Sequence, residues 1–209
     1  MPDRAILFID GNNWYHACKE VGVSNLARLD YALISRKLVG PREWLGTRYY
    51  IGALKHAHGG YKEQRQFLSR IQNADPRITP HYGRIEERPY KNELASVLAE
   101  YLATTPGIDP GLQRDLGAMA AQYQKVSILK EKAADVMLAV EMSRMAWRDE
   151  FDAAYLLSAD GDFTPAVEAV REQGKKVFAV SPLPCSALKG KVNAFILVPK
   201  EWFDDCYGP

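Results

Sequence analysis

The chain has 209 residues, of which 47% are hydrophobic and 25% charged, and its formal net charge at pH 7 is +1. This composition is typical of a soluble globular domain and excludes disordered, collagen-like and coiled-coil chains. The strongest apolar run, Ala5–Ile9, is closed by Asp10 and is far shorter than the about 20 residues of a membrane span. It also lacks the basic leader of a signal peptide. We therefore expect no membrane partner.

Cysteine usage and charge distribution narrow the class of protein further. The three cysteines form no CxxC pair, which indicates a reducing, cytoplasmic location. Residues 55–91 carry a net charge of +4, whereas residues 92–174 carry −7. Such blocks suit an enzyme that binds a polyanion with basic side chains and holds cations with carboxylates. Ordinary solvated surface of both signs explains the pattern more simply, so charge only permits this interpretation.

Apolar and polar stretches alternate along the chain. Ala5–Ile9 is typical of a strand that is buried on both faces, and Asp10–Asn13 separates it from a helix that begins near Trp14. The pair Thr164 and Pro165 is typical of an N-cap followed by the first helical residue. The other expected elements are helices at 26–38, 61–72 and 135–147 and strands at 47–54, 78–85, 153–158, 176–181 and 195–198.

This alternation predicts an α/β fold with a mostly parallel sheet and right-handed crossovers. Residues 91–123 predict two helices, separated by a turn at 104–111 that is rich in proline and glycine. We expect one domain spanning residues 1–209, with a helical insertion at about 91–123. In parallel sheets of this kind, ligands bind at the carboxyl ends of the strands.

Three aspartates follow apolar strands and should meet at that edge. Asp10 follows the first strand, and Asp160 and Asp162 follow the strand at 153–158. Each of these aspartates alone is typical of a turn or helix-cap residue. Asp162 in particular fits a helix cap, because a predicted helix begins directly after it. Clustered carboxylates repel one another unless a cation lies between them. Their oxygens suit Mg²⁺ or Mn²⁺, with water and substrate phosphate as further ligands.

Two more residues join this set as candidates. Asp135 opens a helix behind a basic stretch, where favourable charge at a helix N-terminus would explain it as well. Asn13 stands three residues after Asp10 and would be a ligand, a residue that orients Asp10, or an N-cap.

Basic and aromatic side chains near residues 49–91 are candidates for substrate binding. Tyrosine rings stack on unpaired bases, although most tyrosines in α/β proteins serve packing. The candidates are Tyr49, Tyr50, Tyr61, Tyr82 and Tyr90 for stacking, and Lys55, Lys62, Arg65, Arg70, Arg84, Arg88 and Lys91 for phosphate contacts.

Three ordered motifs resemble those of the NYN domain family. They are Phe8–Asn13, the segment Glu131–Met142, and Leu156–Phe163 followed by Gly174–Val177. The resemblance extends from Ala5 to about Val198, and LabA-like proteins belong to this family within the PIN-like nuclease superfamily. The family often has glycine and valine where this chain has Ala133 and Ala134, aspartate at Glu141, and glycine and serine at Ala159 and Gly161.

The resemblance implies a three-layer α/β/α fold with an acidic pocket that binds a divalent cation, and ribonuclease activity on RNA. Carried onto this chain, the acidic set is Asp10, Asp135, Asp160 and Asp162, accompanied by Asn13 and Ser158. One or two Mg²⁺ or Mn²⁺ ions held there would lower the pKa of a water molecule and stabilise charge on the scissile phosphate. A homodimer is a further expectation.

Three other functions compete with this one. A non-catalytic member of the family would use the same pocket to bind RNA or a regulatory partner. A phosphatase of the haloacid dehalogenase type needs a second aspartate two residues after the first, but position 12 is Asn12. A Rossmann-type nucleotide-binding domain needs a glycine-rich phosphate motif, and no strand here is followed by one.

Overall fold

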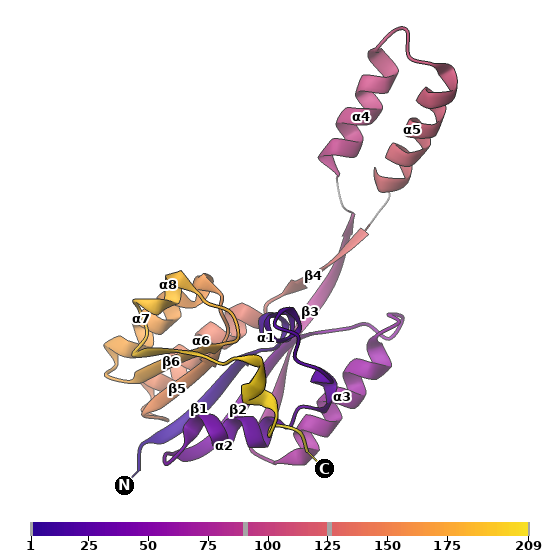
Figure 1. Cartoon of the computed structure of the whole chain (residues 1–209). Helices are drawn as coiled ribbons and strands as arrows, with labels where there is room; N and C mark the ends of the chain where they lie inside the picture. The colour runs from indigo at the N-terminus through magenta and orange to yellow at the C-terminus, as the bar shows by residue number, and fades with distance from the viewer. Residues whose placement is uncertain (1, 90–91, 125–126, 209) are drawn as a thin grey trace. The chain divides into compact units, whose positions relative to one another are not determined.

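A computed structural model describes residues 2–89, 92–124 and 127–208 and confirms the α/β fold. Seven strands form a sheet in the order β4-β3-β2-β1-β5-β6-β7 (Figure 1). β1 pairs in parallel with β2 and β5, β2 with β3, β5 with β6, and β6 with β7. The strands are β1 Arg4–Asp10, β2 Glu43–Ala53, β3 Ile78–Pro89, β4 Ser127–Lys132, β5 Ala153–Leu157, β6 Lys176–Ser181 and β7 Ala194–Leu197.

Helices cover both faces of the central strands and complete three layers. One apolar core lies against α1, α2 and α3, and the other lies against α6 and α7. The α-helices here are α1 Gly11–Glu20, α2 Tyr31–Val39, α3 Tyr61–Ala74, α6 Ala134–Trp147, α7 Thr164–Glu172 and α8 Ser186–Lys189. Short 3-10 helices add η1 Leu26–Arg28, η2 Gly161–Phe163 and η3 Lys200–Phe203.

β1 lies at the centre of the sheet and explains the apolar run that predicted it. Leu7 and Ile9 face the core of α1–α3, whereas Ile6 and Phe8 face the core of α6 and α7. Because both faces of the strand are covered, every position between Ala5 and Ile9 is apolar. Asp10 interrupts the run where the strand reaches the carboxyl edge of the sheet.

The chain divides into two compact units. The first, here called the α/β unit, runs up to Arg84 and resumes at Lys132. The second, here called the helical unit, spans residues 85–131 and contains α4 Glu93–Thr104 and α5 Pro110–Gln124. These two helices lie side by side (Figure 1), and they agree with the two helices expected around the turn at 104–111.

Four local expectations differ from the structure. Helix α1 begins at Gly11, three residues before the expected start, because Asp10 itself caps it. The stretch 26–38 is interrupted at Asp30, whose carboxylate accepts hydrogen bonds from two backbone N–H groups and starts α2 afresh. Thr164 is the first residue of α7 and not its N-cap, since its hydroxyl donates to the carbonyl of Gly161. Strand β4 was not expected, because Ser127–Lys132 contains only two apolar residues.

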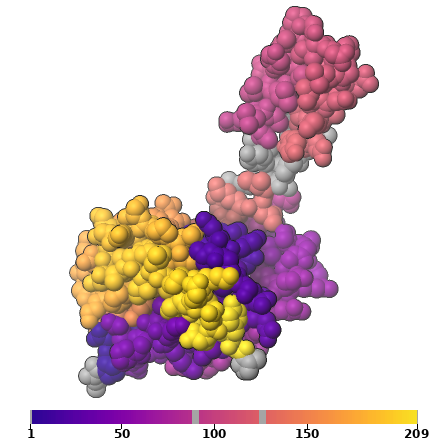
Figure 2. Space-filling view, in the orientation of Figure 1, coloured from indigo at the N-terminus to yellow at the C-terminus, as the bar shows by residue number. Residues whose placement is uncertain are grey.

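The C-terminal segment packs onto the N-terminal part of the α/β unit. The Asp30 N–H donates to the carbonyl of Cys206 at 2.8 Å, and Leu29 forms an isolated β-bridge with Tyr207. The rings of Trp14 and Phe203 lie 5.8 Å apart. Figure 2 shows this segment in yellow against the indigo and purple surface of the first elements. Within the described ranges, no helix has the length and apolar character to cross a membrane.

Candidate active site at the carboxyl edge of the sheet

Asp10 occupies the junction between β1 and α1. Its carboxylate accepts a hydrogen bond from the backbone N–H of Asn13 at 3.1 Å and thereby caps the helix. The junction is tight, because a Cβ at Gly11 would lie 2.6 Å from Cε1 of Tyr49 and 2.7 Å from the carbonyl oxygen of Tyr50. The cap of α1 is therefore Asp10, and the side chain of Asn13 is left for another contact.

The loop after β5 is tied to this junction by two side chains. Ser158 donates from its hydroxyl to Oδ2 of Asp10 at 3.1 Å and accepts from the N–H of Asp160 at 3.1 Å. Oδ1 of Asn13 accepts from the N–H of Ala159 at 2.9 Å. Since β1 and β5 are paired neighbours, their carboxyl ends bring these residues together. Asn13 and Ser158 thus hold the loop and Asp10 in fixed relative positions.

Asp160 immediately precedes the short helix η2, and Asp162 lies within it. The carboxylate of Asp160 accepts from the N–H of Asp162 at 2.9 Å, so Asp160 caps η2. The cap that the sequence suggested for Asp162 therefore belongs to Asp160. Asp162 lies in the first turn of η2 with its side chain exposed.

Asp135 lies in the first turn of α6, where β3 approaches closely. A Cβ at Gly83 of β3 would lie 2.7 Å from the carbonyl oxygen of Lys132 and 3.0 Å from the backbone nitrogen of Ala134. The helix starts behind Ala133, which has a left-handed φ of 76°. Glycine adopts this conformation more readily than alanine, so the chain holds a strained residue two positions before Asp135.

The four aspartates influence one another electrostatically. Asp10 is only 6% exposed, and this burial raises its pKa to about 6. The hydrogen bond from Asn13 opposes the shift, while the charges of Asp135 and Asp160 increase it. Burial also raises the pKa of Asp135, and the carboxylates of Asp160 and Asp162 raise it further. Without a cation, the edge of the sheet therefore holds negative charges that destabilise one another.

The donor chemistry of this cluster fits a hard divalent cation. Among the described residues, no three His, Cys, Asp or Glu side chains lie close enough to form a metal site by themselves. Mg²⁺ does not require such a cage, because it is commonly held by one or two carboxylates with waters and substrate phosphates. Carboxylate oxygens that repel one another meet this requirement.

A comparison with protein-family models identifies the family of this sequence. A sequence model described as the NYN domain matches residues 4–198. The chain belongs to the NYN domain family. This membership indicates a nuclease-like function for a domain whose carboxylates gather at one sheet edge.

A solved structure supports the fold of this NYN domain. A crystal structure of a protein of unknown function, VPA0982, from Vibrio parahaemolyticus RIMD 2210633 is similar, with a TM-score of 0.57. The match covers 99% of this chain and 96% of that chain at 18% sequence identity, and it therefore speaks to the fold alone. A comparison of the sequence with curated proteins gives no match.

Two of the basic candidates lie on the neighbouring strands β2 and β3 or just after them. Arg84 of β3 pairs in register with Ala53, the last residue of β2, and Lys55 follows two residues later. Both side chains are exposed. In the next parallel pair along the sheet, Asp10 of β1 is in register with Tyr50 of β2. A carboxylate thus ends β1, while Lys55 follows the end of β2 and Arg84 lies at the corresponding level within β3.

The aromatic candidates fall into different environments. Tyr50 is 1% exposed, donates from its hydroxyl to Glu141 at 2.8 Å and stacks on His81, so it is not available to bases. Tyr82 is 48% exposed, and Tyr61 is half-buried. Lys62, Arg65 and Arg70 are exposed on α3. Tyr90, Lys91 and the side chain of Arg88 lie outside the described residues.

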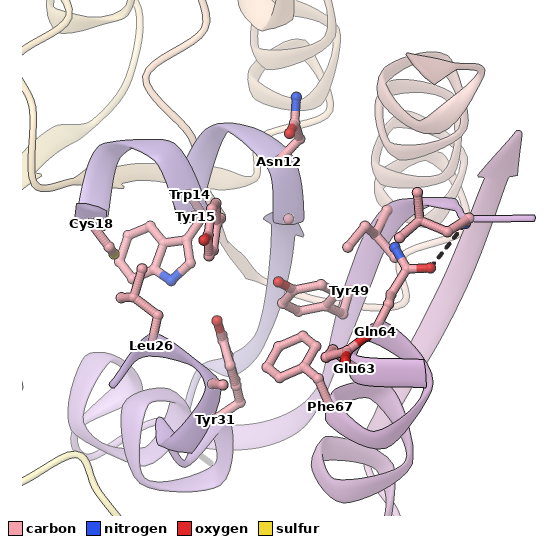
Figure 3. A pocket seen from close by; sticks show the side chains of 14 residues that line it. Asn12, Trp14, Tyr15, Cys18, Leu26, Tyr31, Tyr49, Glu63, Gln64 and Phe67 are labelled. Atoms are coloured by element: carbon pink, nitrogen blue, oxygen red, sulfur yellow. Dashed lines mark hydrogen bonds between the residues drawn. The ribbon is translucent and has the colours of Figure 1, made fainter. Parts of the chain in front are cut away.

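One feature near the site was missed by sequence reasoning. A cavity of about 380 Å³ adjoins Gly11 and Asn12, and aromatic rings form much of its wall (Figure 3). The rings come from Trp14 and Tyr15 of α1, Tyr31 of α2, Tyr49 of β2 and Phe67 of α3. Except for Tyr15, which is 47% exposed, each of these residues resembles an ordinary core residue in its own element. Only the packing of four elements shows that the rings surround a space.

Proposed function

We propose that this NYN domain is a divalent-metal-dependent ribonuclease that hydrolyses the phosphodiester bonds of single-stranded RNA. The observation that carries the proposal is the group of aspartates at the carboxyl edge of the sheet, in which Asp10 is buried beside Asp135 and Asp160. Burying a carboxylate near two others costs stability, and a cation at this position would offset that cost.

The chain's own residues have separate tasks in this reaction. One or two carboxylates at a time from the set Asp10, Asp135, Asp160 and Asp162 would hold Mg²⁺ or Mn²⁺ together with water and substrate phosphate, and the bound ion would stabilise negative charge on the reacting phosphate. Ser158 fixes the orientation of Asp10 by its hydrogen bond, and Asn13 fixes the loop that carries Asp160. These bonds align the carboxylates before substrate arrives, so little reorganisation is needed during reaction.

Basic groups on the neighbouring strands would bind the rest of the substrate. Lys55 lies just after the end of β2 and Arg84 lies within β3, in register with the last residue of β2; both are exposed and would contact phosphates on either side of the scissile bond. RNA is the proposed polymer because the motifs resemble a family with several ribonucleases. The same resemblance underlies our assignment to the LabA-like and PIN-like groups, and a cytoplasmic homodimer remains a prediction.

A second candidate function is a regulatory protein that binds RNA or a protein partner without cleaving it. The observation in its favour is that no three potential metal ligands converge within the described part of the chain. Such a regulatory protein would keep the aspartates and the neighbouring basic side chains of a nuclease but would not cleave RNA.

Cleavage of end-labelled single-stranded RNA by the purified full chain separates the two candidates. We expect cleavage with Mn²⁺ or Mg²⁺, none with EDTA, and a loss of at least about 100-fold in Asp160→Asn. Asp204→Asn, an exposed aspartate in the C-terminal segment, is the matched control and should cleave as wild type does. Folded wild-type protein that cleaves neither single-stranded nor structured RNA with either metal would favour the regulatory function.

A further inference from the structure

The aromatic cavity shares a wall with the carboxylate site. Gly11 and Asn12 line the cavity, and they directly follow Asp10 in the chain. Consecutive Cα atoms lie about 3.8 Å apart, so a group in the cavity and a phosphate at Asp10 are separated by little more than the turn itself. One nucleotide spans this kind of separation with its base on one side and its phosphate on the other.

The walls of the cavity are preformed. Tyr31 and Tyr49 meet edge to face at 5.2 Å between ring centroids, and Tyr49 and Phe67 at 5.7 Å. Gln64 also lines the cavity, and its side chain is fixed in place, because its amide donates to the carbonyl of Gly52 and accepts from the N–H of Leu54, each at 2.9 Å. At about 380 Å³ the space falls within the range of small-molecule sites.

A buried donor in this wall, the indole nitrogen of Trp14, makes no hydrogen bond of normal geometry. Trp14 is 1% exposed, and its indole lies close enough to the hydroxyl of Tyr31 to oppose the rise that burial causes in the pKa of that phenol. Figure 3 shows this nitrogen on the side of the ring that faces Leu26 and Tyr31, within the space that the labelled side chains surround. A buried N–H without a well-formed hydrogen bond is costly, so a ligand that offers an acceptor would gain from it.

The mouth of the cavity carries polar groups and one small side chain. Asn12, Tyr15 and Glu63 line it and are exposed, so an amide, a phenol and a carboxylate are available to a planar polar ligand. Ala27 of η1 also lines the cavity and is exposed. An apolar interior with a few polar groups at the entrance matches a heterocycle better than an alkyl chain.

We propose that this cavity binds one unpaired nucleobase of the strand whose phosphate lies at the carboxylates. The proposal rests on the proposed function, because the nucleobase belongs to that substrate. The base would stack among the aromatic rings, accept a hydrogen bond from the indole of Trp14 and turn its amino edge toward Glu63. Binding a base here requires an unpaired strand, so the cavity makes the domain selective for single-stranded over double-stranded RNA.

Binding of a short single-stranded RNA containing 2-aminopurine tests this site. Every protein carries Asp160→Asn, so that the strand stays intact in the presence of Mg²⁺. We expect quenching of 2-aminopurine on binding, because the base stacks on aromatic rings. Ala27→Phe fills the entrance and should weaken binding about 10-fold or more and abolish the quenching. Ala103→Phe, on the exposed side of α4, is the matched control and should bind like its parent.

A smaller change probes the rim of the cavity. Glu63→Gln should weaken binding of strands that present amino groups and leave oligouridine binding unchanged, whereas Glu172→Gln on the exposed end of α7 changes neither. Equal affinity and equal quenching in Ala27→Phe would overturn the base site even if wild type cleaves RNA. If wild type does not cleave RNA but the quenching still depends on Ala27, the base site is supported and the nuclease proposal is overturned. Absence of RNA binding would overturn the base site.

Discussion

The α/β unit and the helical unit differ in how far they bury their large apolar side chains. In the α/β unit, Phe8 and Leu156 are completely buried between the sheet and its helices. In the helical unit, Leu94 is 80% exposed, Val97 62% and Tyr101 57%. A pair of helices buries only the stripe between them, whereas a three-layer sandwich buries both faces of its central strands. The candidate site is built on the unit with the larger core, where neighbouring elements hold side chains in place.

The largest expected effect comes from truncating a core residue in each unit. Leu156→Ala should lower the free energy of unfolding by about 2–5 kcal/mol, because it leaves a cavity in a closely packed core. Leu94→Ala in α4 should change it by less than about 0.5 kcal/mol, because that side chain is exposed. Urea unfolding followed by far-UV circular dichroism reports on both units, and tryptophan fluorescence reports on the α/β unit alone, because all four tryptophans lie there. Equal effects of the two substitutions would break the comparison.

Adding one methyl group should have opposite effects at two glycines. Gly11→Ala should destabilise the α/β unit by about 1–3 kcal/mol, because the new Cβ meets Tyr49 and the backbone at Tyr50. Gly117→Ala in α5 has open space around the added carbon and should stabilise the helix by about 0.5–1 kcal/mol. The first is measured by fluorescence-detected unfolding and the second by thermal melting in far-UV circular dichroism. A neutral Gly11→Ala would show that the junction is looser than described.

Replacing alanine by glycine should also have opposite effects in the two units. Ala133→Gly should stabilise the α/β unit by about 1 kcal/mol, because it relieves the left-handed φ of 76° in front of α6. Ala118→Gly on the exposed side of α5 should destabilise the helical unit by about 0.5–1 kcal/mol. The midpoints of urea unfolding in the two variants give the signs. Destabilisation by Ala133→Gly would contradict the presence of strain before Asp135.

The smallest expected effect is a dependence of stability on pH from an ion pair far from the carboxylate site. Asp75 accepts three hydrogen bonds from Arg77, and the guanidinium lowers its pKa to about 2. Its contribution to stability is therefore present above pH 4 and is lost as the pH falls from about 4 to 2. We expect a loss of about 0.5–1 kcal/mol over this interval. Asp75→Asn should remove that part of the slope in urea unfolding, whereas the exposed Asp115→Asn should leave the slope unchanged.

The parts of the fold that local sequence determines were predictable. The apolar run of β1 and the position of Asp10 after it follow from burial on both faces, and the structure has both. Asp160 was likewise expected at the same edge, because parallel strands end on the same side of the sheet. Proline and glycine between α4 and α5 were sufficient to predict that turn.

The features that were missed depend on contacts between distant residues. Strand β4 carries little apolar character, and only its place beside β3 in the sheet identifies it. Threonine is a common helix cap, but the hydroxyl of Thr164 donates its hydrogen bond to the carbonyl of Gly161 instead. The aromatic cavity needs Trp14, Tyr49 and Phe67 from three elements at once. No local pattern distinguishes rings that surround a cavity from rings that fill a core.

The central claim is that the aspartates at the sheet edge of the α/β unit form a divalent cation site. Binding of Mn²⁺ to the full chain, measured by isothermal titration calorimetry, tests it most directly, with Asp10→Asn and the distant Asp204→Asn compared under the same conditions. We predict that wild type and Asp204→Asn bind Mn²⁺ alike and that Asp10→Asn loses at least about 10-fold in affinity, as expected when a charged ligand is removed. Wild-type protein that binds no Mn²⁺, or an affinity unchanged in Asp10→Asn, would contradict the account.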